Sequence, residues 1–174
     1  MRLDGHIFLI GFMGVGKTST SRQLGRKLGV RELDTDVEIE QRENRSIPEI
    51  FEQFGEPYFR QLETELLDSL AGEEPCIVSC GGGLAMREEN AAKMRAAGKV
   101  VFLTAAPETI FEHVKNSTNR PLLNGNMNIP YIRELMEARE PKYQAAADIT
   151  VETDGLMPDE VADKIILEIN GRIR

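Results

Sequence analysis

The chain lacks several features that would tie it to particular classes of protein. Its 174 residues include no tryptophan, two histidines and two cysteines. Cys76 and Cys80 lie in one apolar run, and in an extended strand their Cα atoms would be ~13 Å apart. A disulfide requires less than about 7 Å. We therefore expect two free thiols in a cytoplasmic protein that is stabilised by its core alone.

Long apolar runs and clusters of basic residues are also missing. No apolar run approaches the roughly 20 residues that cross a bilayer, and we expect no signal peptide. The 21 Lys and Arg residues are outnumbered by 29 Asp and Glu residues, for a net charge of −8. Without a basic run, this balance argues against nucleic acid or an anionic membrane as partner. Composition and length favour one globular domain over 1–174, and the absence of long heptads favours a monomer.

Short apolar runs alternate with longer segments of helical period. Strands are expected at 6–12, around 33, and at 76–80, 99–104 and 149–151. Helices are expected at 17–28, 47–54, from 57 onward, and at 87–97, 107–114, 131–147 and 158–169. Because the strands look apolar on both faces, the pattern predicts an α/β fold with a parallel sheet covered on both sides. The polar segment 116–130 is expected to be a mobile loop.

The most specific motif is Gly11–Thr18, GFMGVGKT, which matches the phosphate-binding pattern G-x-x-x-x-G-K-[ST] between the first strand and the first helix. Its glycines let backbone N–H groups point at phosphate oxygens, and the helix N-terminus adds positive charge. Lys17 would bridge the β- and γ-phosphates, and Thr18 would bind Mg²⁺. A plain glycine-rich turn is the alternative. The predicted nucleotide-binding residues are Gly14, Val15, Gly16, Lys17, Thr18 and Ser19.

Two acidic residues, Asp34 and Asp36, follow the second strand. If the segment is still extended, their side chains share one face. One carboxylate could then hold a magnesium-bound water, and the other could face a substrate hydroxyl. The alternative is an Asp-rich N-cap for a helix that begins near Val37.

Three glycines and two arginines suggest a site for a small carboxylate. Gly81, Gly82 and Gly83 follow the third strand and would let a ligand approach the backbone, although they could form a plain tight turn. Arg60 and Arg139 flank apolar helix stripes, where a guanidinium needs an anion unless it lies along the surface. Arginine binds a carboxylate through two parallel hydrogen bonds, so the two together favour carboxylate capture.

These motifs, in this order, resemble the shikimate kinase family over nearly the whole chain. The matching segments are Gly11–Thr18, Asp34-Thr35-Asp36, Phe59-Arg60-x-x-Glu63, Gly81-Gly82-Gly83, Arg120-Pro121-Leu122-Leu123 and Arg139-x-Pro141-x-Tyr143. The resemblance implies a three-layer P-loop kinase fold with a five-stranded parallel sheet flanked by helices and a mobile lid. It also implies transfer of the ATP γ-phosphate to the 3-hydroxyl of shikimate, in aromatic amino acid biosynthesis.

The resemblance also implies roles for individual residues. Thr18 and Asp34 would serve Mg²⁺, Asp34 through water, and Asp36 would bind the shikimate hydroxyls and act as a base. The expected shikimate-binding residues are Asp36, Arg60, Gly81, Gly82, Gly83 and Arg139, within a region around 34–62 and beyond it. The expected catalytic residues are Lys17, Asp36 and Arg120. Arg120 is also expected to bind the nucleotide, since it would reach the transferred phosphate from the lid at about 116–130.

Two positions depart from the family pattern. Seven residues before the lid arginine, the family often has another arginine against adenine; here the position is His113, with Lys115 nearby, so the adenine contacts stay open. Cys80 replaces a common Thr or Ser, and we expect it to be a packed residue without thiol chemistry. Two rival functions remain: a kinase of another small hydroxy acid such as gluconate, and a non-catalytic nucleotide-binding protein.

Overall fold

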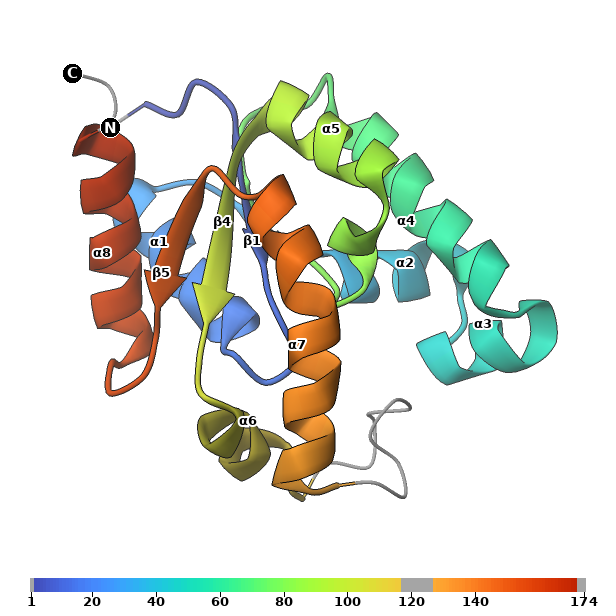
Figure 1. Ribbon diagram of the computed structural model, residues 1–174. Helices are drawn as coiled ribbons and strands as arrows, with labels where there is room; N and C mark the ends of the chain where they lie inside the picture. The colour runs from blue at the N-terminus through green and yellow to red at the C-terminus, as the bar shows by residue number, and fades with distance from the viewer. Residues whose placement is uncertain (1, 117–126, 172–174) are drawn as a thin grey trace.

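The computed structural model describes residues 2–116 and 127–171, and its centre is a parallel sheet (Figure 1). The strands are β1 (His6–Ile10), β2 (Glu32–Asp34), β3 (Ile77–Ser79), β4 (Gly98–Thr104) and β5 (Ile149–Glu152). They are ordered β2-β3-β1-β4-β5, and every pair of neighbours is parallel. The predicted α/β class and five-stranded parallel sheet are confirmed.

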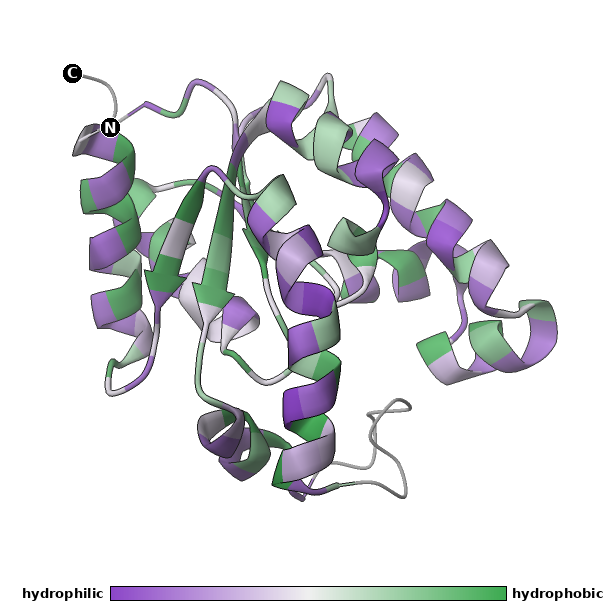
Figure 2. Cartoon of the chain, in the orientation of Figure 1, coloured by the Kyte–Doolittle hydropathy of each residue, from purple (hydrophilic) through white to green (hydrophobic). Residues whose placement is uncertain are grey.

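Helices cover both faces of the sheet. They are α1 (Lys17–Leu28), α2 (Thr35–Glu43), α3 (Ile47–Phe54), α4 (Glu56–Leu70), α5 (Glu88–Ala97), α6 (Pro107–Val114), α7 (Ile129–Ala146) and α8 (Pro158–Gly171), with a 3₁₀ turn, η1 (Leu84–Met86). Helices α1 and α8 pack on one face, and α4, α5 and α7 on the other. Figure 2 shows apolar residues along β4 and β5, whereas polar residues alternate with apolar ones along the helices.

The central strand β1 divides the core into its two halves. Ile7 and Leu9 pack into the cluster under α1 and α8, while Phe8 and Ile10 pack into the cluster under α5 and α7. Each of these four side chains is at most 1% exposed. Edge strand β5 differs, because its residues alternate between buried and exposed. The expectation that every strand is apolar on both faces is therefore wrong for this edge, and also for edge strand β2, in which Glu32 is exposed and only Leu33 is buried.

Local signals placed several helices correctly. Helices α1, α3 and α6 have the predicted bounds. The Ser46 side chain accepts a hydrogen bond from the backbone N–H of Glu49, and the Glu49 carboxylate accepts one from Ser46 N–H, which together form a capping box. Gly29 ends α1 in the left-handed conformation, with φ 67°.

Two predicted boundaries need correction. Helix α2 begins at Thr35, so Asp36 lies in its first turn rather than in an extended segment. Helix α7 begins at Ile129, so the end of the predicted loop 116–130 is helical. The Asn128 side chain accepts a hydrogen bond from Tyr131 N–H at 2.9 Å and caps this helix. Residues 117–126 of the predicted lid lie outside the described residues.

Both cysteines are buried and free, as expected. Within residues 2–116 and 127–171, no helix has the length and apolar character that a membrane span requires.

Candidate active site

A large cavity lies beyond the carboxyl ends of the strands, where ligands of parallel α/β sheets gather. Its volume is about 910 Å³. It is lined by residues of the loop after β1 and the start of α1 (13–20), by Asp34, Asp36, Val37, Ser79, Cys80, Gly81 and Gly82, and by Thr109, His113, Thr153, Gly155, Leu156, Met157, Pro158 and Val161. The six residues of this loop that were predicted to bind the nucleotide therefore face one cavity. The seventh predicted nucleotide-binding residue, Arg120, lies outside the described residues.

The loop between β1 and α1 curls around Lys17. Gly16 makes the turn into α1 with φ 97°, a conformation that favours glycine. The Lys17 ammonium donates hydrogen bonds to the carbonyl oxygens of Gly11 at 2.7 Å and Phe12 at 3.0 Å. A buried ammonium needs such acceptors, and here the loop itself supplies them. The positive charge is thus fixed at the floor of the cavity.

Thr18 and Asp34 form an oxygen pair beside the loop. The Thr18 hydroxyl donates to Asp34 Oδ2 at 3.0 Å, and Ser79 Oγ lies 3.4 Å from the same hydroxyl. Asp34 Oδ1 accepts from the backbone N–H groups of Asp36 and Val37 and caps α2. No cluster of three or more His, Cys, Asp or Glu side chains able to hold a metal occurs among the described residues. An oxygen pair still suits Mg²⁺, which keeps several waters and binds substrate phosphates.

Asp36 lies in the first turn of α2 and faces the cavity. Burial raises the pKa of its carboxyl to about 6, and repulsion from Asp34 adds to this, while Lys17 opposes it. Asp34 is the N-cap of α2, as the alternative interpretation held. Both carboxylates nevertheless line the cavity. The cap itself turns Asp36 toward the glycines that follow β3.

The triple glycine is the place where three charged side chains from separate helices meet. A Cβ at Gly81 would lie 2.7 Å from Asp36 Oδ1, and one at Gly83 only 2.5 Å from an Arg60 nitrogen. At Gly82 the nearest atom is Arg139 Nη1, at 3.5 Å. Side chains at 81 and 83 would therefore displace the charges. The segment is a turn, but its missing side chains make room for the site.

Arg60 is held by carboxylates of its own helix. It donates to Glu63 Oε1 at 2.7 Å and to Glu56 Oε1 at 3.1 Å. Glu63 is fully buried, and its Oε2 has no hydrogen-bond partner among the described residues. Burial raises the pKa of Glu63 to about 7, although the Arg60 guanidinium lowers it. Sequence reasoning placed Glu63 in a motif but gave it no role; its spacing of three residues from Arg60 was the available signal.

Arg139 approaches the glycines from α7. Its guanidinium lies 5.9 Å from the centre of the Phe12 ring, and its Nη1 is buried without a hydrogen-bond partner in the described structure. The hydroxyl of Tyr143, one turn further along α7, donates to the Gly82 carbonyl oxygen. Leaving a buried guanidinium nitrogen without an acceptor is unfavourable, so an anion is expected to fill this end of the site.

The remaining predicted residues lie in different places. Arg120 lies outside the described residues. His113 lines the cavity, and its Nδ1 is 2.6 Å from the Gly14 carbonyl oxygen, whereas Lys115 pairs with Glu112 at 2.7 Å and does not line it. Cys80 is buried, and burial raises the pKa of its thiol. Sequence reasoning missed the turn 153–158, which closes the cavity between β5 and α8.

Comparison with known proteins gives a consistent result. A family model described as shikimate kinase matches residues 13–170. A shikimate kinase from Persephonella marina is 42% identical over 97% of this chain and 99% of its own length. One from Dehalococcoides mccartyi strain 195 is 42% identical over 95% of this chain and 93% of its own length.

Solved structures agree. The shikimate kinase from Acinetobacter baumannii, in complex with shikimate, matches with a TM-score of 0.91 and 34% identity over 97% of this chain and 94% of that chain. The Aquifex aeolicus shikimate kinase matches with a TM-score of 0.84 and 39% identity, over 97% and 98%. A gluconokinase from Sinorhizobium meliloti has a TM-score of 0.59 and 14% identity, over 100% of both chains, which shows a shared fold alone.

Proposed function

The chain belongs to the shikimate kinase family of ATP-dependent kinases that act on an alcohol group, and we propose that the cleft described above performs this family's reaction. The γ-phosphate of ATP is transferred to the 3-hydroxyl of shikimate, which gives shikimate 3-phosphate and ADP. One observation carries the residue assignment. The buried, unpartnered Nη1 of Arg139 lies against the same triple glycine as Asp36 and Arg60. Asp36, Gly81 and Gly82 also line the cavity that contains the phosphate-binding loop, so the two arginines lie directly behind one end of it.

The end of the cleft beside Arg60, Arg139 and the triple glycine binds the shikimate carboxylate. We call it the acid end, because it takes the organic acid, and we call the end at the phosphate-binding loop the phosphate end. Arg139 and Arg60 donate to it, and Gly82 lets it approach the backbone; the flanking Gly81 and Gly83 leave room for the Asp36 and Arg60 side chains that face it. Nη1 of Arg139 then gains the acceptor that it lacks in the described structure. Glu63, one turn further along α4, holds the Arg60 guanidinium in place by accepting its 2.7 Å hydrogen bond.

Asp36 acts on the acceptor hydroxyl. As the 3-hydroxyl oxygen attacks the γ-phosphorus, the bond from that phosphorus to the β,γ-bridging oxygen breaks, and ADP leaves. The hydroxyl proton passes to the Asp36 carboxylate, whose pKa of about 6 leaves it mostly ionised at neutral pH. Lys17, at the floor of the cavity, neutralises charge on the β- and γ-phosphates.

Thr18 and Asp34 are the residues that would hold Mg²⁺, which supplies charge neutralisation to the phosphates when bound. Only one Asp34 oxygen is engaged in the helix cap, so the other stays directed at Thr18. Ser19, next in the loop, faces the same cavity. Arg120 is proposed to approach the transferred phosphate. The adenine base is assigned to the end lined by His113 and the turn 153–158.

A kinase of gluconate is the rival activity, and the gluconokinase likeness at 14% identity supports only the fold. The test mixes the protein with MgATP and, separately, shikimate, gluconate or no acceptor, and follows ADP release. Shikimate-dependent ADP release well above both other reactions is expected. Faster turnover of gluconate would favour the rival kinase, and ATP binding without turnover of either acceptor would favour a nucleotide-binding protein.

Three broader assignments stay predictions. They are a single domain over 1–174, with a shikimate-binding region around 34–62 and a lid around 116–130, a monomeric state and a cytoplasmic location. Size-exclusion chromatography with light scattering would test the monomer, for which 19.5 kDa is expected.

A further inference from the structure

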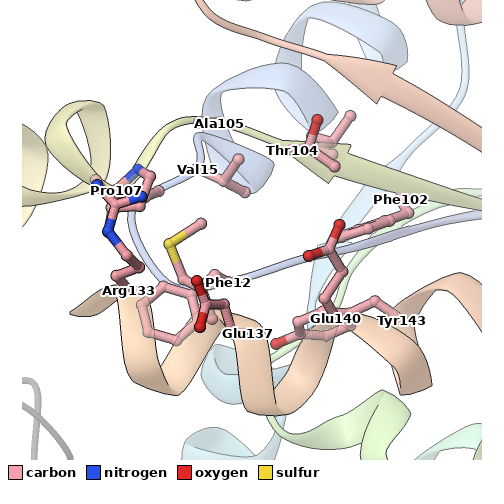
Figure 3. A pocket seen from close by; sticks show the side chains of 13 residues that line it. Phe12, Val15, Phe102, Thr104, Ala105, Pro107, Arg133, Glu137, Glu140 and Tyr143 are labelled. Atoms are coloured by element: carbon pink, nitrogen blue, oxygen red, sulfur yellow. The ribbon is translucent and has the colours of Figure 1, made fainter. Parts of the chain in front are cut away.

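A second cavity lies beside Phe12 of the phosphate-binding loop, between the end of β4, the start of α6 and helix α7 (Figure 3). Its volume is about 220 Å³. It is lined by Phe12, Val15, Phe102, Leu103, Thr104, Ala105, Pro107, Ile110, Arg133, Met136, Glu137, Glu140 and Tyr143. Only Val15 also lines the large cavity, so this is a separate chamber.

The inner wall of this chamber is apolar and aromatic. Phe12, Phe102 and Tyr143 line it, and the Phe102 and Tyr143 rings stack with centroids 5.1 Å apart. Ala105 and Met136 complete the apolar surface. Aromatic faces attract cations as well as other rings. A flat apolar group with a positive charge at one end suits such a wall.

The outer rim of the chamber is acidic. Glu137 and Glu140 rise from α7 over the aromatic wall, and Figure 3 shows Arg133 apart from them, toward Pro107. Arg133 is already paired with Glu108 at 2.8 Å. Neither Glu137 nor Glu140 has an ion-pair partner among residues 2–116 and 127–171. Glu140 Oε1 accepts a hydrogen bond from the neutral Gln144 amide at 3.1 Å. The rim therefore offers a cation the whole Glu137 carboxylate and the second oxygen of Glu140.

We propose that this chamber is a second ligand site, for a protonated organic amine that carries one apolar ring. The ring packs against Phe12, Phe102 and Tyr143, and the ammonium group lies between the carboxylates of Glu137 and Glu140. A volume of about 220 Å³ is too small for a nucleotide and suits a single ring with a short chain. The rim charge disfavours an anionic ligand.

Two residues link the chamber to the acid end of the main cleft. Phe12 carries the Arg139 guanidinium near its ring, and Tyr143 holds the Gly82 carbonyl through its hydroxyl. A ligand that packs on Phe12 and Tyr143 restricts the movement of these two side chains, and through them of the Arg139 guanidinium and the Gly82 carbonyl. Its binding therefore alters the affinity for shikimate. This linkage rests on the proposed function, whereas binding of the amine does not.

The experiment titrates the whole protein with 2-phenylethylamine, its neutral analogue 2-phenylethanol and the anion 3-phenylpropanoate, and follows binding by calorimetry and by amide chemical shifts. The amine is expected to bind about tenfold more tightly than the alcohol, and the anion more weakly still. Glu137→Gln and Glu140→Gln should each weaken amine binding about fivefold, as expected for partly exposed ion pairs. The matched control Glu134→Gln, exposed on α7 but outside the chamber, should leave it unchanged.

Equal affinity for the amine and the alcohol, or equal amine affinity in the Glu137→Gln and Glu134→Gln variants, would overturn the site. Chemical shift changes that avoid Phe12, Ala105 and Tyr143 would do the same. A separate titration with shikimate, with and without saturating amine, tests the linkage, and identical shikimate affinities would refute it. If shikimate itself fails to bind, the proposed function fails while the amine titration still decides the second site.

Discussion

The two ends of the main cleft are built in opposite ways. At the phosphate end, the polar groups satisfy one another: Lys17 donates to two loop carbonyls, and the Thr18 hydroxyl donates to Asp34. At the acid end, Nη1 of Arg139 and Oε2 of Glu63 are buried without partners in the described structure. One end is complete without its ligand, and the other is not.

This difference separates two kinds of binding. The phosphate end comes from one contiguous loop, so its shape is set locally and is ready for phosphate. The acid end takes its charges from α2, α4 and α7 and keeps them desolvated until a carboxylate arrives. Desolvated charges lower stability but bind a matching charge strongly. Substitutions at the acid end should therefore weaken shikimate binding, whereas their effects on the free energy of unfolding should differ from one residue to the next.

The largest effect is expected from Asp36→Asn. The amide cannot accept the hydroxyl proton, so kcat should fall by roughly 10²- to 10⁴-fold. ATP affinity should stay near that of the wild type, because Asp36 faces the acceptor. Steady-state kinetics and ATP titration measure the two quantities. Glu38→Gln, in the same helix and paired on the surface with Arg42, is the control. An unchanged kcat in Asp36→Asn would remove Asp36 from the reaction.

The next effect concerns the two arginines. Arg139→Ala and Arg60→Ala should each weaken shikimate binding by about 1.5–3 kcal/mol, the range for hydrogen bonds to charged groups. Their stabilities should differ, because Arg139→Ala removes a buried nitrogen without a partner, whereas Arg60→Ala deprives Glu63 of its partner. Calorimetric titration and thermal unfolding provide the two readouts. Wild-type shikimate affinity in both variants, or equal destabilisation by both, would contradict the proposed difference between the two ends.

A smaller effect is expected in the pH dependence of stability. The ordinary pKa of a glutamate carboxyl is 4.5, and burial raises that of Glu63 to about 7 in the folded protein. Between these values the folded state keeps a proton that the unfolded chain has lost, so the free energy of unfolding should fall as the pH rises from about 4.5 to 7. At about 1.4 kcal/mol per pKa unit, the loss is at most about 3.5 kcal/mol over the whole range and about 1.4 kcal/mol over any one pH unit. Urea unfolding at several pH values measures it.

Two variants sharpen this pH test. Glu63→Gln should remove the Glu63 part of the decline, and the smaller part that remains belongs to Asp36, whose pKa of about 6 is raised in the same direction. Glu65→Gln, on the exposed side of the same helix, should keep the full decline. The same slope in both variants would show that Glu63 does not hold the proton.

Sequence reasoning succeeded where contiguous residues determine the structure. The phosphate-binding loop is one eight-residue pattern. Gly29 predicts where α1 stops, and Ser46 predicts where α3 begins. It also grouped Arg60, Arg139 and the triple glycine as a carboxylate site, because two arginines beside apolar helix stripes need an anion, and the structure places both guanidinium groups against these glycines. The start of α7 was missed even though Asn128 and Pro130 are ordinary helix-start signals.

Other features depend on packing that no local pattern encodes. The start of α2 itself follows the local N-cap alternative, because Asp34 accepts from the N–H groups of Asp36 and Val37. What no local pattern encodes is the hydrogen bond from Thr18 to Asp34, which joins two segments sixteen residues apart. A glutamate is normally exposed, so the burial of Glu63 follows only from the packing of α4 against the glycine turn. The second chamber likewise exists only because α7 passes in front of Phe12.

The smallest effect is expected from Ser46→Ala, which removes one half of the capping box of α3. The loss should be about 1 kcal/mol in the free energy of unfolding, measured by urea denaturation. Phe51 of α3 packs on Phe59 of α4, with ring centroids 5.0 Å apart, and α4 carries Arg60. A looser α3 should therefore weaken shikimate binding slightly and leave ATP affinity unchanged. A parallel loss of ATP affinity would show that the two ends are coupled through the fold, and that the acid end is not the separate, ligand-completed unit argued above.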